Sequence, residues 1–461
     1  MKKNVTLLIL LLCFQFPETS WGQTIVYPWR ATTAIVKTGD SFEVWFNATA
    51  GQTIKSIRLQ GPYNTVATTY SLQSGRWIYD ITSLNTYNTK ITVKVPQKTP
   101  ADRYDIILNT STGPATSLAG VKVIKDYKDS YYIVHFSDIH AFQNGNKTAL
   151  NRLSTIVDMA NIINPEMIFN TGDNLYRPSE DRMNQLFSGN KVLGLKGLNQ
   201  LSAATFTVVG NHDTDFDKVP EEGFYPEKSK WWNQWWGLQA YNFKYNNGRF
   251  IVINDAWIGF DPTKQIEEAS VWLTKAGPGN LRLGAAHIRD SELLDLDKKV
   301  NFNLVLVGHN HHIANTNPSL FNAKPIQYIS NSMREHLEFN LYKINSKTGT
   351  AEAVGSPTAQ VEYIENPSDF DRPELYKPKL RLTYVQPNTG TIKNNTASLV
   401  NTFSFPIEAA RIRFVMPLGS KYGVSKGKIE QSFDGQSYHI VDIQLNIEPN
   451  STNEITIFPL P

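Results

Sequence analysis

Apolar and polar residues alternate in short runs between Thr24 and Tyr127. In Ser41–Phe46 and Lys90–Val95, for example, apolar side chains recur at every second position. This period is typical of strands that bury one face. Turn residues separate the runs at intervals typical of a sandwich of two sheets, and no helical period of useful length appears. We therefore predict an N-terminal, immunoglobulin-like β-sandwich domain over residues 24–127.

The pattern changes between residues 130 and 346. Apolar runs that end in polar residues alternate here with amphipathic helical stretches, which indicates an α/β domain. We predict its strands at Tyr132–Phe136, Met167–Asn170, Thr205–Val209, Phe250–Asn254, Leu281–Ala286, Leu304–Val307 and Ile326–Ser330.

Two helices are predicted from the spacing of apolar residues in this middle segment. The first is predicted to end before Pro165, with one apolar face formed by Leu150, Leu153, Ile156, Val157, Ala160 and Ile163. The second runs from Gln265 to Ala276, with candidate core positions at Ile266, Ala269, Val271 and Leu273.

A connector rich in proline and charge, Asn366–Pro378, follows the α/β segment. The chain then returns to strand-like runs at Lys379–Tyr384, Ile407–Val415 and Tyr438–Ile447. We predict a C-terminal β-sandwich domain over residues 370–461.

The N-terminus resembles a secretory signal peptide. A basic start precedes an apolar run, Val5–Phe16, which ends at Pro17. The run is shorter than the roughly 20 residues that cross a bilayer, so we predict a cleaved signal over residues 1–22. Cys13, the only cysteine, would leave with it. A mature chain without disulfides favours a bacterial envelope, so we expect an exported protein that is periplasmic, on the cell surface or secreted.

Composition and charge narrow the class of protein further. The chain has 461 residues, enough for two or three domains, and a net charge of only +3. Such a small surplus does not predict a nucleic-acid partner, and no basic stripe with interleaved aromatic residues supports an extracellular nuclease. Beyond the N-terminus we expect no transmembrane segment. The oligomeric state is left open.

Metal-binding side chains follow five of the predicted strands. Because the carboxyl ends of strands meet at one crevice in α/β folds, we expect these side chains to form one site. Carboxylates and imidazoles without thiolates suit Mn, Zn, Fe or Mg. Two adjacent divalent ions can hold both an attacking hydroxide and the oxygens of a phosphate ester. The side chains lie in Asp138-Ile139-His140, Gly172-Asp173-Asn174, Gly210-Asn211-His212-Asp213, His287 and Gly308-His309-Asn310-His311.

The order of these five motifs resembles that of the calcineurin-like metallophosphoesterase family. The resemblance implies a four-layer αββα sandwich and hydrolysis of a phosphate ester, on a small molecule, glycan or lipid, by a hydroxide that two divalent metal ions activate. It assigns Asp138, His140, Asp173 and His311 to one metal. The second metal would be bound by Asp173, Asn211, His287 and His309. The resemblance also implies that Asn211 stabilises the transition state, that His212 protonates the leaving group and that Asp213 orients His212.

Several alternatives are open at this point. Gly172-Asp173-Asn174-Leu175-Tyr176 also fits the purple acid phosphatases, whose tyrosine binds iron, but His140 should fill that position, so we predict a packing role for Tyr176. The Asp-x-His motif favours phosphodiesters, with phosphomonoesters as the alternative. A surface protein that binds a glycan or partner without catalysis is the alternative from another class.

Three further features have both a structural and a functional interpretation. The run Trp231–Trp236 could form an aromatic wall at the cleft, although we favour a helix that packs on Tyr241 and Phe243. Arg289 and Arg334 could bind a substrate charge or form surface ion pairs. We expect a structural role for His135, His336 and His439, and no metal contact for Asn310 and His312.

Overall fold

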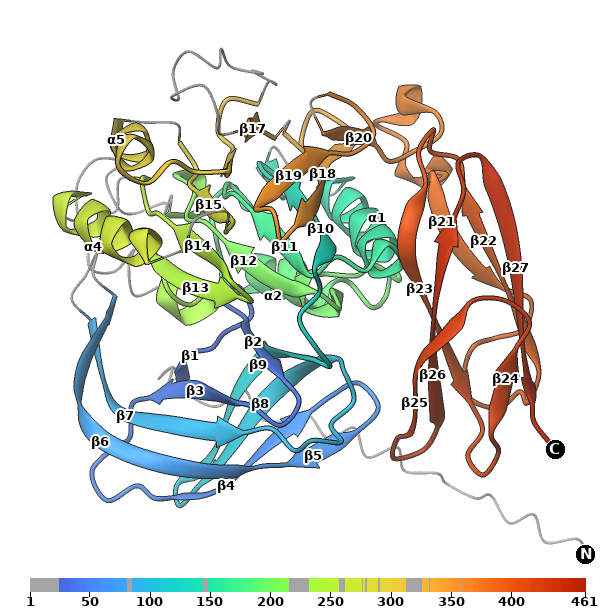
Figure 1. The fold of residues 1–461 in the computed structure, drawn as a ribbon, viewed down its shortest axis with the longest axis horizontal. Coiled ribbons are helices and arrows are strands. Elements are labelled where there is room, and N and C mark those ends of the chain that lie inside the picture. The colour runs from blue at the N-terminus through green and yellow to red at the C-terminus, as the bar shows by residue number, and fades with distance from the viewer. Residues whose placement is uncertain are drawn as a thin grey trace, which may run out of the picture.

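The computed structural model describes residues 25–80, 85–143, 148–214, 232–256, 262–275, 277, 280–288, 291–311, 326–330, 332–357 and 359–461. The predicted signal over residues 1–22 therefore lies outside the described residues. Figure 1 shows three strand-rich parts along the chain: a blue N-terminal part, a central part with helices and a red C-terminal part.

The N-terminal part consists of two sheets packed face to face. One sheet has the order β1-β3-β7-β6 and the other β2-β9-β8-β4-β5. Val44, Ile91 and Val121 belong to the core between them, because alternate side chains of each strand point inward. The strands are Ile25–Tyr27 (β1), Ala34–Lys37 (β2), Ser41–Phe46 (β3), Ile54–Gln60 (β4), Thr65–Ala67 (β5), Thr69–Asp80 (β6), Asn85–Lys94 (β7), Arg103–Thr110 (β8) and Gly113–Ile124 (β9).

The central part contains two further sheets. The first has the order β12-β11-β10-β18-β19, with β20 also paired to β18. It is built from Ser130–Phe136 (β10), Met167–Asn170 (β11), Ala204–Thr207 (β12), Glu338–Asn345 (β18), Thr350–Ala353 (β19) and Gln360–Glu362 (β20). The second has the order β13-β14-β15-β16-β17, built from Tyr241–Tyr245, Gly248–Val252, Arg282–Ala285, Leu304–Val307 and Ile326–Ile329.

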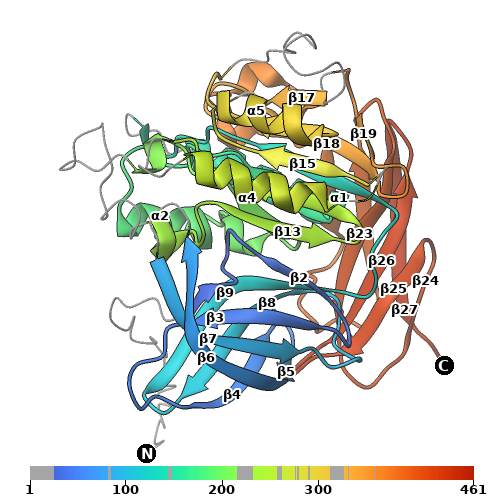
Figure 2. The same cartoon turned by 60° about the vertical axis from the view of Figure 1, so that its left-hand side comes forward.

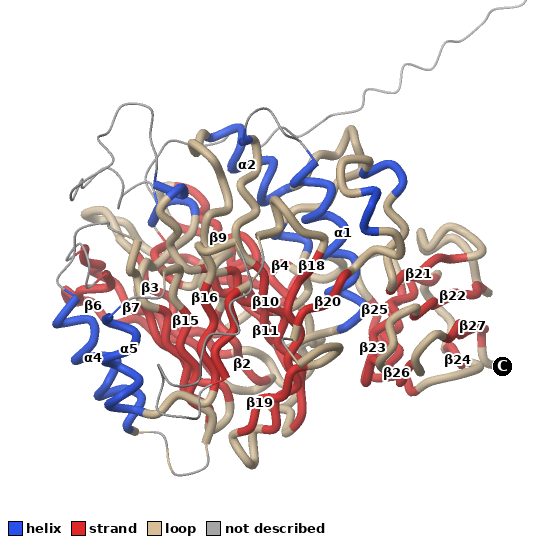
Figure 3. The backbone as a smooth tube through the Cα atoms, turned by 90° about the horizontal axis from the view of Figure 1, so that it is seen from above, coloured by secondary structure: helices blue, strands red, loops and turns tan. Residues whose placement is uncertain are grey.

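Helices cover the outer faces of these two sheets (Figure 3). Thr148–Ile163 (α1) and Glu180–Ser188 (α2) lie on the first sheet, and Pro262–Thr274 (α4) and Ser291–Val300 (α5) lie on the second. The two sheets face each other through a buried layer that includes Phe169, Phe250 and Leu283. The order helix, sheet, sheet, helix confirms the predicted four-layer αββα fold.

The structure differs from two sequence-based expectations in this part. The first sheet extends past residue 346, because β19 and β20 pair with β18. Val271, predicted as a core residue of α4, is 58% exposed. Its neighbours Ile266, Ala269 and Leu273 are buried, and their spacing of three and four residues places Val271 on the opposite face.

The C-terminal part is a second sandwich, with sheets β21-β22-β27-β24 and β23-β26-β25. It packs on the outer side of α1, where β21 and β23 contact the helix (Figures 1 and 2). The strands are Leu380–Tyr384 (β21), Asn395–Asn401 (β22), Ile407–Met416 (β23), Tyr422–Val424 (β24), Lys428–Asp434 (β25), His439–Ile447 (β26) and Ser451–Pro459 (β27). Both flanking parts are thus strand-rich, as predicted.

A partly buried arginine, Arg413, joins the N-terminal and C-terminal parts. Arg413 donates through Nη1 to Asp102 Oδ2 at 2.7 Å, and through Nε and Nη2 to the two oxygens of Asp442, each at 2.7 Å. The side chains of Asp102 and Asp442 are only 4% and 1% exposed. Burial would raise the pKa of Asp442, but Arg411 and Arg413 outweigh burial and lower it.

We expect Arg413→Met to destabilise the protein by about 3–5 kcal/mol at pH 7, because it leaves two buried carboxylates without their main cation. Folding lowers the pKa of Asp442, so in the wild type this group contributes fully to the free energy of unfolding above its unfolded pKa of roughly 4. The contribution declines as the pH falls from that value through the lowered folded pKa. The difference in the free energy of unfolding between the wild type and the variant should therefore become smaller at acid pH. Denaturant unfolding at pH 7 and at about pH 2, which lies well below the unfolded value, measures both effects.

Lys298→Met is the control, because Lys298 and Asp295 form an exposed ion pair with side chains 64% and 58% accessible. Such pairs contribute about 0–1 kcal/mol. Equal destabilisation by the two variants would contradict a structural role for Arg413.

Candidate metal centre

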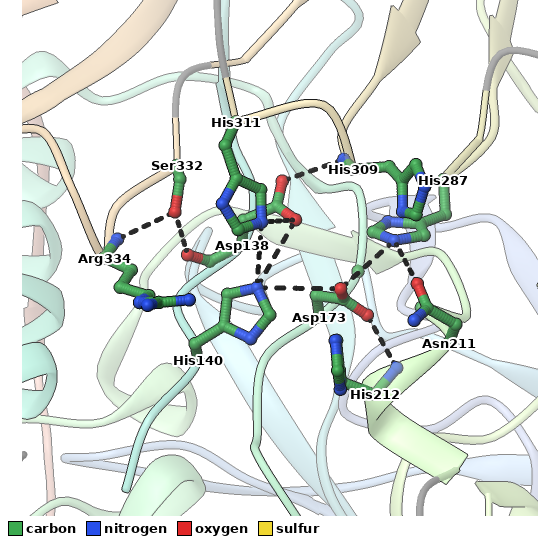
Figure 4. A network of polar contacts seen from close by, with 12 residues as sticks. Asp138, His140, Asp173, Asn211, His212, His287, His309, His311, Ser332 and Arg334 are labelled. Carbon is green, nitrogen blue, oxygen red and sulfur yellow. Dashed lines mark hydrogen bonds and ion pairs between the residues drawn. The ribbon is translucent and has the colours of Figure 1, made fainter. Parts of the chain in front are cut away.

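The candidate site lies where strands of both central sheets end. Loops after β10, β11 and β12 carry Asp138, His140, Asp173, Asn211 and His212, and loops after β15 and β16 carry His287, His309 and His311 (Figure 4). Parallel pairing of β10 with β11 and of β11 with β12 aligns the first three strand ends. The structure thus brings together all seven predicted metal ligands.

The backbone is strained at most of these positions. Five of the predicted ligands have positive φ angles: Asp138 (53°), His140 (45°), Asp173 (54°), His309 (69°) and His311 (56°). Each such residue costs of order 1–3 kcal/mol and persists only where its surroundings fix it. Strain of this kind concentrates at functional sites, which agrees with the convergence of the side chains.

Glycines allow the loops to approach closely. A Cβ on Gly172, whose φ is 97°, would lie 2.7 Å from His287 Nδ1 and 2.8 Å from Gly210 Cα. A Cβ on Gly210 would lie 2.1 Å from the backbone nitrogen of Asp173. Any side chain at either position would push the two loops apart.

The first cluster contains Asp138, His140 and His311. Nε2 of His140 lies 3.1 Å from Nε2 of His311, and Oδ1 of Asp138 lies 3.4 Å from the same His311 nitrogen. Oδ1 of Asp138 is buried and accepts no hydrogen bond within the described residues. Two imidazole nitrogens and a carboxylate oxygen that face one point at these separations fit the ligand set of a divalent cation, whose bonds to such atoms are about 2.0–2.2 Å long.

The second cluster contains Asn211, His287 and His309. Nε2 of His287 lies 3.1 Å from Oδ1 of Asn211, and the rings of His287 and His309 stand nearly perpendicular with centroids 5.1 Å apart. One ligand atom from each of His287, His309 and Asp173 lies within 4.8 Å of the others. These donors fit a second cation.

Asp173 connects the two clusters through a single oxygen. Its Oδ2 atom lies 3.6 Å from Nε2 of His140 and 3.4 Å from Nε2 of His287. The other oxygen, Oδ1, accepts a hydrogen bond of 2.9 Å from the backbone N–H of His212. That bond fixes the carboxylate so that one oxygen faces both metal positions.

Contacts behind the clusters orient the imidazoles. Nδ1 of His287 lies 2.6 Å from the carbonyl oxygen of Thr171, so it carries the proton and leaves Nε2 free to bind a metal. Nδ1 of His311 lies 3.2 Å from Oε1 of Glu335. Oδ2 of Asp138 accepts a hydrogen bond of 3.0 Å from the backbone of His309.

The electrostatics of the site favour bound cations. Burial would raise the pKa of Asp173, but His287 and other nearby imidazoles outweigh burial and lower it. Burial acts to lower the pKa of His287, but the Asp173 carboxylate raises it to about 10. Burial lowers the pKa of His140 to about 4. Metals bind charged carboxylates and neutral imidazoles, so a bound cation takes the place of the proton that Asp173 holds on His287.

His212 and Asp213 differ in their surroundings. The His212 ring lies beside the clusters, with its centroid 5.0 Å from that of His140 and 5.6 Å from that of Tyr176. Asp213 is buried and accepts hydrogen bonds from the backbone of Gly210, Asn174 and Leu175, so its carboxylate joins the loops after β11 and β12. Burial, and then the negative charge of Asp173, raises the pKa of Asp213 to about 7.

The aromatic run does not pack where we predicted. Trp232 and Trp236 are buried with ring centroids 5.1 Å apart, and Trp236 packs on Phe187 of α2. Phe243 instead stacks on Phe206, in the layer between the two sheets. The tryptophans thus form part of the core beside α2, while Trp231 lies outside the described residues.

The remaining predicted residues are distributed as follows. His135 is buried within β10 and hydrogen-bonds with Thr171. His439 lies on the C-terminal part and hydrogen-bonds with Ser432 and Asp434. Arg289 and His312 lie outside the described residues.

The residues that support the ligands were not predicted from the sequence. Four such residues contact the ligands or their backbone: Thr171, Asp255, Ser332 and Glu335. Asp255 offers the clearest missed signal, because it follows the predicted strand Phe250–Asn254 and accepts hydrogen bonds from the backbone of His287 and Ile288.

A four-layer α/β fold with two clusters of metal donors that share one carboxylate defines a binuclear metallohydrolase. Residues 131–312 match the family model of the calcineurin-like phosphoesterases. The protein is therefore a phosphoric ester hydrolase that uses two divalent metal ions.

Two solved structures illustrate the similarity. Purple acid phosphatase PPD1 from yellow lupin (Lupinus luteus) seeds is 12% identical over 68% of this chain and 69% of its own, with a TM-score of 0.42. A dimetal phosphatase from Danio rerio is 11% identical over 46% of this chain and 92% of its own, with a TM-score of 0.33. No curated protein matches the sequence. Among the described residues, none of the helices has the length and apolar character needed to cross a membrane.

Proposed function

We propose that this hydrolase acts on phosphodiesters in preference to phosphomonoesters. The observation that carries the proposal is the position of His140, whose Nε2 faces Asp138, Asp173 and His311 within 3.1–3.8 Å. We infer that this imidazole fills the position that a metal-binding tyrosine would need. The resulting Asp-x-His arrangement resembles that of cyclic-nucleotide and related phosphodiesterases.

In this proposal each residue of the site has a defined role. One divalent ion is bound by Asp138, His140, Asp173 and His311. The other is bound by Asp173, Asn211, His287 and His309. When bound, the two ions lower the pKa of water and neutralise charge on the ester oxygens.

The proposal assigns proton transfer to His212 and charge stabilisation to Asn211. The imidazole of His212 lies beside the metal donors and can give a proton to the departing oxygen. The amide group of Asn211 can stabilise negative charge that develops on the phosphate. Asp213 supports both by holding the loop on which they lie, through its hydrogen bonds to Gly210 and Asn174.

The test is the ratio of two chromogenic activities with protein loaded with Mn or Zn. We expect a higher kcat/KM for bis-p-nitrophenyl phosphate than for p-nitrophenyl phosphate. The reverse ratio would contradict the diester preference and leave the hydrolase intact. Absence of turnover on both substrates would contradict hydrolysis itself.

We also propose that the protein is exported. Support comes from the basic start, the apolar run Val5–Phe16 and the lack of any cysteine other than Cys13. Fractionation of expressing bacteria should recover the enzyme outside the cytoplasm, with an N-terminus near residue 23. A cytoplasmic protein that still carries residues 1–22 would refute this.

A further inference from the structure

The loop from Ser332 to His336 attaches directly to the strand end that carries Asp138. The backbone N–H of Arg334 donates to the carbonyl oxygen of Asp138 at 3.1 Å, and the hydroxyl of Ser332 donates to the same oxygen at 3.0 Å. Figure 4 shows the Arg334 side chain extending from this loop beside His140. The position of Arg334 is thus tied to the first metal cluster.

A buried arginine on α1 holds the same loop from behind. Arg152 is fully buried and donates through Nη1 to the carbonyl oxygens of Met333 at 3.0 Å and Arg334 at 2.5 Å. It also donates through Nη2 to the carbonyl of Phe370 at 3.3 Å. Burying a cation is costly unless hydrogen bonds compensate it, and here two of those bonds fix the backbone around Arg334.

The guanidinium of Arg334, in contrast, keeps N–H donors that can bind a ligand. Its side chain is 36% exposed, and within the described residues its only ion-pair contact is Oε1 of Glu335, at the long distance of 4.0 Å. That oxygen already lies 3.2 Å from Nδ1 of His311. A rigidly placed arginine with free donors at the edge of a metal site can bind an anion in the bidentate manner that guanidinium favours.

We propose that Arg334 binds a second anionic group of the substrate, distinct from the phosphate that is cleaved. In the proposed function two bound cations would offset the charge of the reacting phosphate, so we assign Arg334 to another anionic group. In Figure 4, Asp138 and His140 lie between Arg334 and the second cluster at Asn211 and His287, so the guanidinium reaches a substituent on the first-metal side. The substrate class is then an ester whose organic part carries a carboxylate or a further phosphate. This inference rests on the proposed hydrolysis.

The test uses two substrates that differ only in the second charge: thymidine 5′-(p-nitrophenyl phosphate) and the same compound with a 3′-phosphate. The wild type should prefer the 3′-phosphorylated substrate by roughly 10-fold or more in kcat/KM, the effect expected of a charge-assisted hydrogen bond. Arg334→Ala should abolish the preference through KM, and Arg334→Lys should keep part of it. Arg58→Ala removes one positive charge from an exposed position on β4 and should leave the preference unchanged.

Two outcomes would overturn the inference. One is a wild type with no preference, or a preference that survives in Arg334→Ala. The other is an equal loss on both substrates, which would indicate contact with the reacting phosphate instead. If the wild type cleaves neither substrate, the proposed hydrolysis is wrong independently of this inference. Calorimetric titration of the metal-loaded protein then tests whether Arg334 binds the second anionic group. Thymidine 3′,5′-bisphosphate should then bind more tightly than thymidine 5′-phosphate to the wild type only, and equal binding would overturn the inference.

Discussion

Replacing Asp173 with alanine should eliminate hydrolysis and reduce bound metal from two ions per chain to one or none. A single oxygen of Asp173 faces Nε2 of both His140 and His287, so the substitution removes a ligand from both metal positions. Loss of a residue that merely supports a ligand already costs about 10–100-fold in affinity or activity, and loss of the shared ligand should cost well beyond that. Elemental analysis after dialysis, together with kcat for bis-p-nitrophenyl phosphate, measures both effects.

Asp158→Ala is a matched control, because Asp158 lies on the exposed side of α1 and pairs there with Lys196. It should leave metal content and turnover unchanged. A folded Asp173→Ala protein that still binds two ions tightly would show that the clusters do not depend on a common carboxylate.

Replacing His212 with alanine should lower kcat by about 10²–10⁴-fold while metal content stays near the wild-type level. The backbone N–H of residue 212, which fixes the Asp173 carboxylate, is kept in the variant, so the metal positions should remain formed. Because the imidazole is proposed to protonate the leaving group, the loss should be smaller for p-nitrophenyl esters than for alkyl esters, whose leaving oxygen needs the proton more.

His439→Ala, on the C-terminal part, should behave like the wild type with both kinds of ester. Equal losses for good and poor leaving groups in His212→Ala would remove proton transfer from its role. Loss of metal in that variant would instead point to a ligand or a structural role.

Much of the site could be predicted from the sequence because the relevant order is local. Each candidate ligand follows an apolar run, and an apolar run of four or five residues in an α/β pattern is a buried strand. Parallel strands bring their ends to one edge, so Asp138, Asp173 and Asn211 had to lie near one another once the strands were recognised. The alternation of strands and helices indicated an α/β domain, whereas the four-layer arrangement was implied only by the resemblance to the calcineurin-like phosphoesterases.

The supporting contacts could not be predicted, because they depend on how distant segments pack. Glu335 contacts His311 only because its loop returns to the end of β10. In the sequence, Arg152 is indistinguishable from any polar residue of a helix, and nothing there indicates that it donates to the carbonyl oxygen of Met333. Val271 was assigned to the core because it is apolar. It is exposed, because its position around the axis of α4 faces solvent.

The internal position of β18 in the first sheet sets the order in which the protein can mature. This strand pairs with β10 in the interior of the first sheet although about 200 residues separate them along the chain. The Ser332 loop that anchors Asp138 immediately precedes it. A ribosome must therefore synthesise nearly the whole catalytic part before the ligands of β10 can take their final places, and metal uptake becomes a late event in biogenesis.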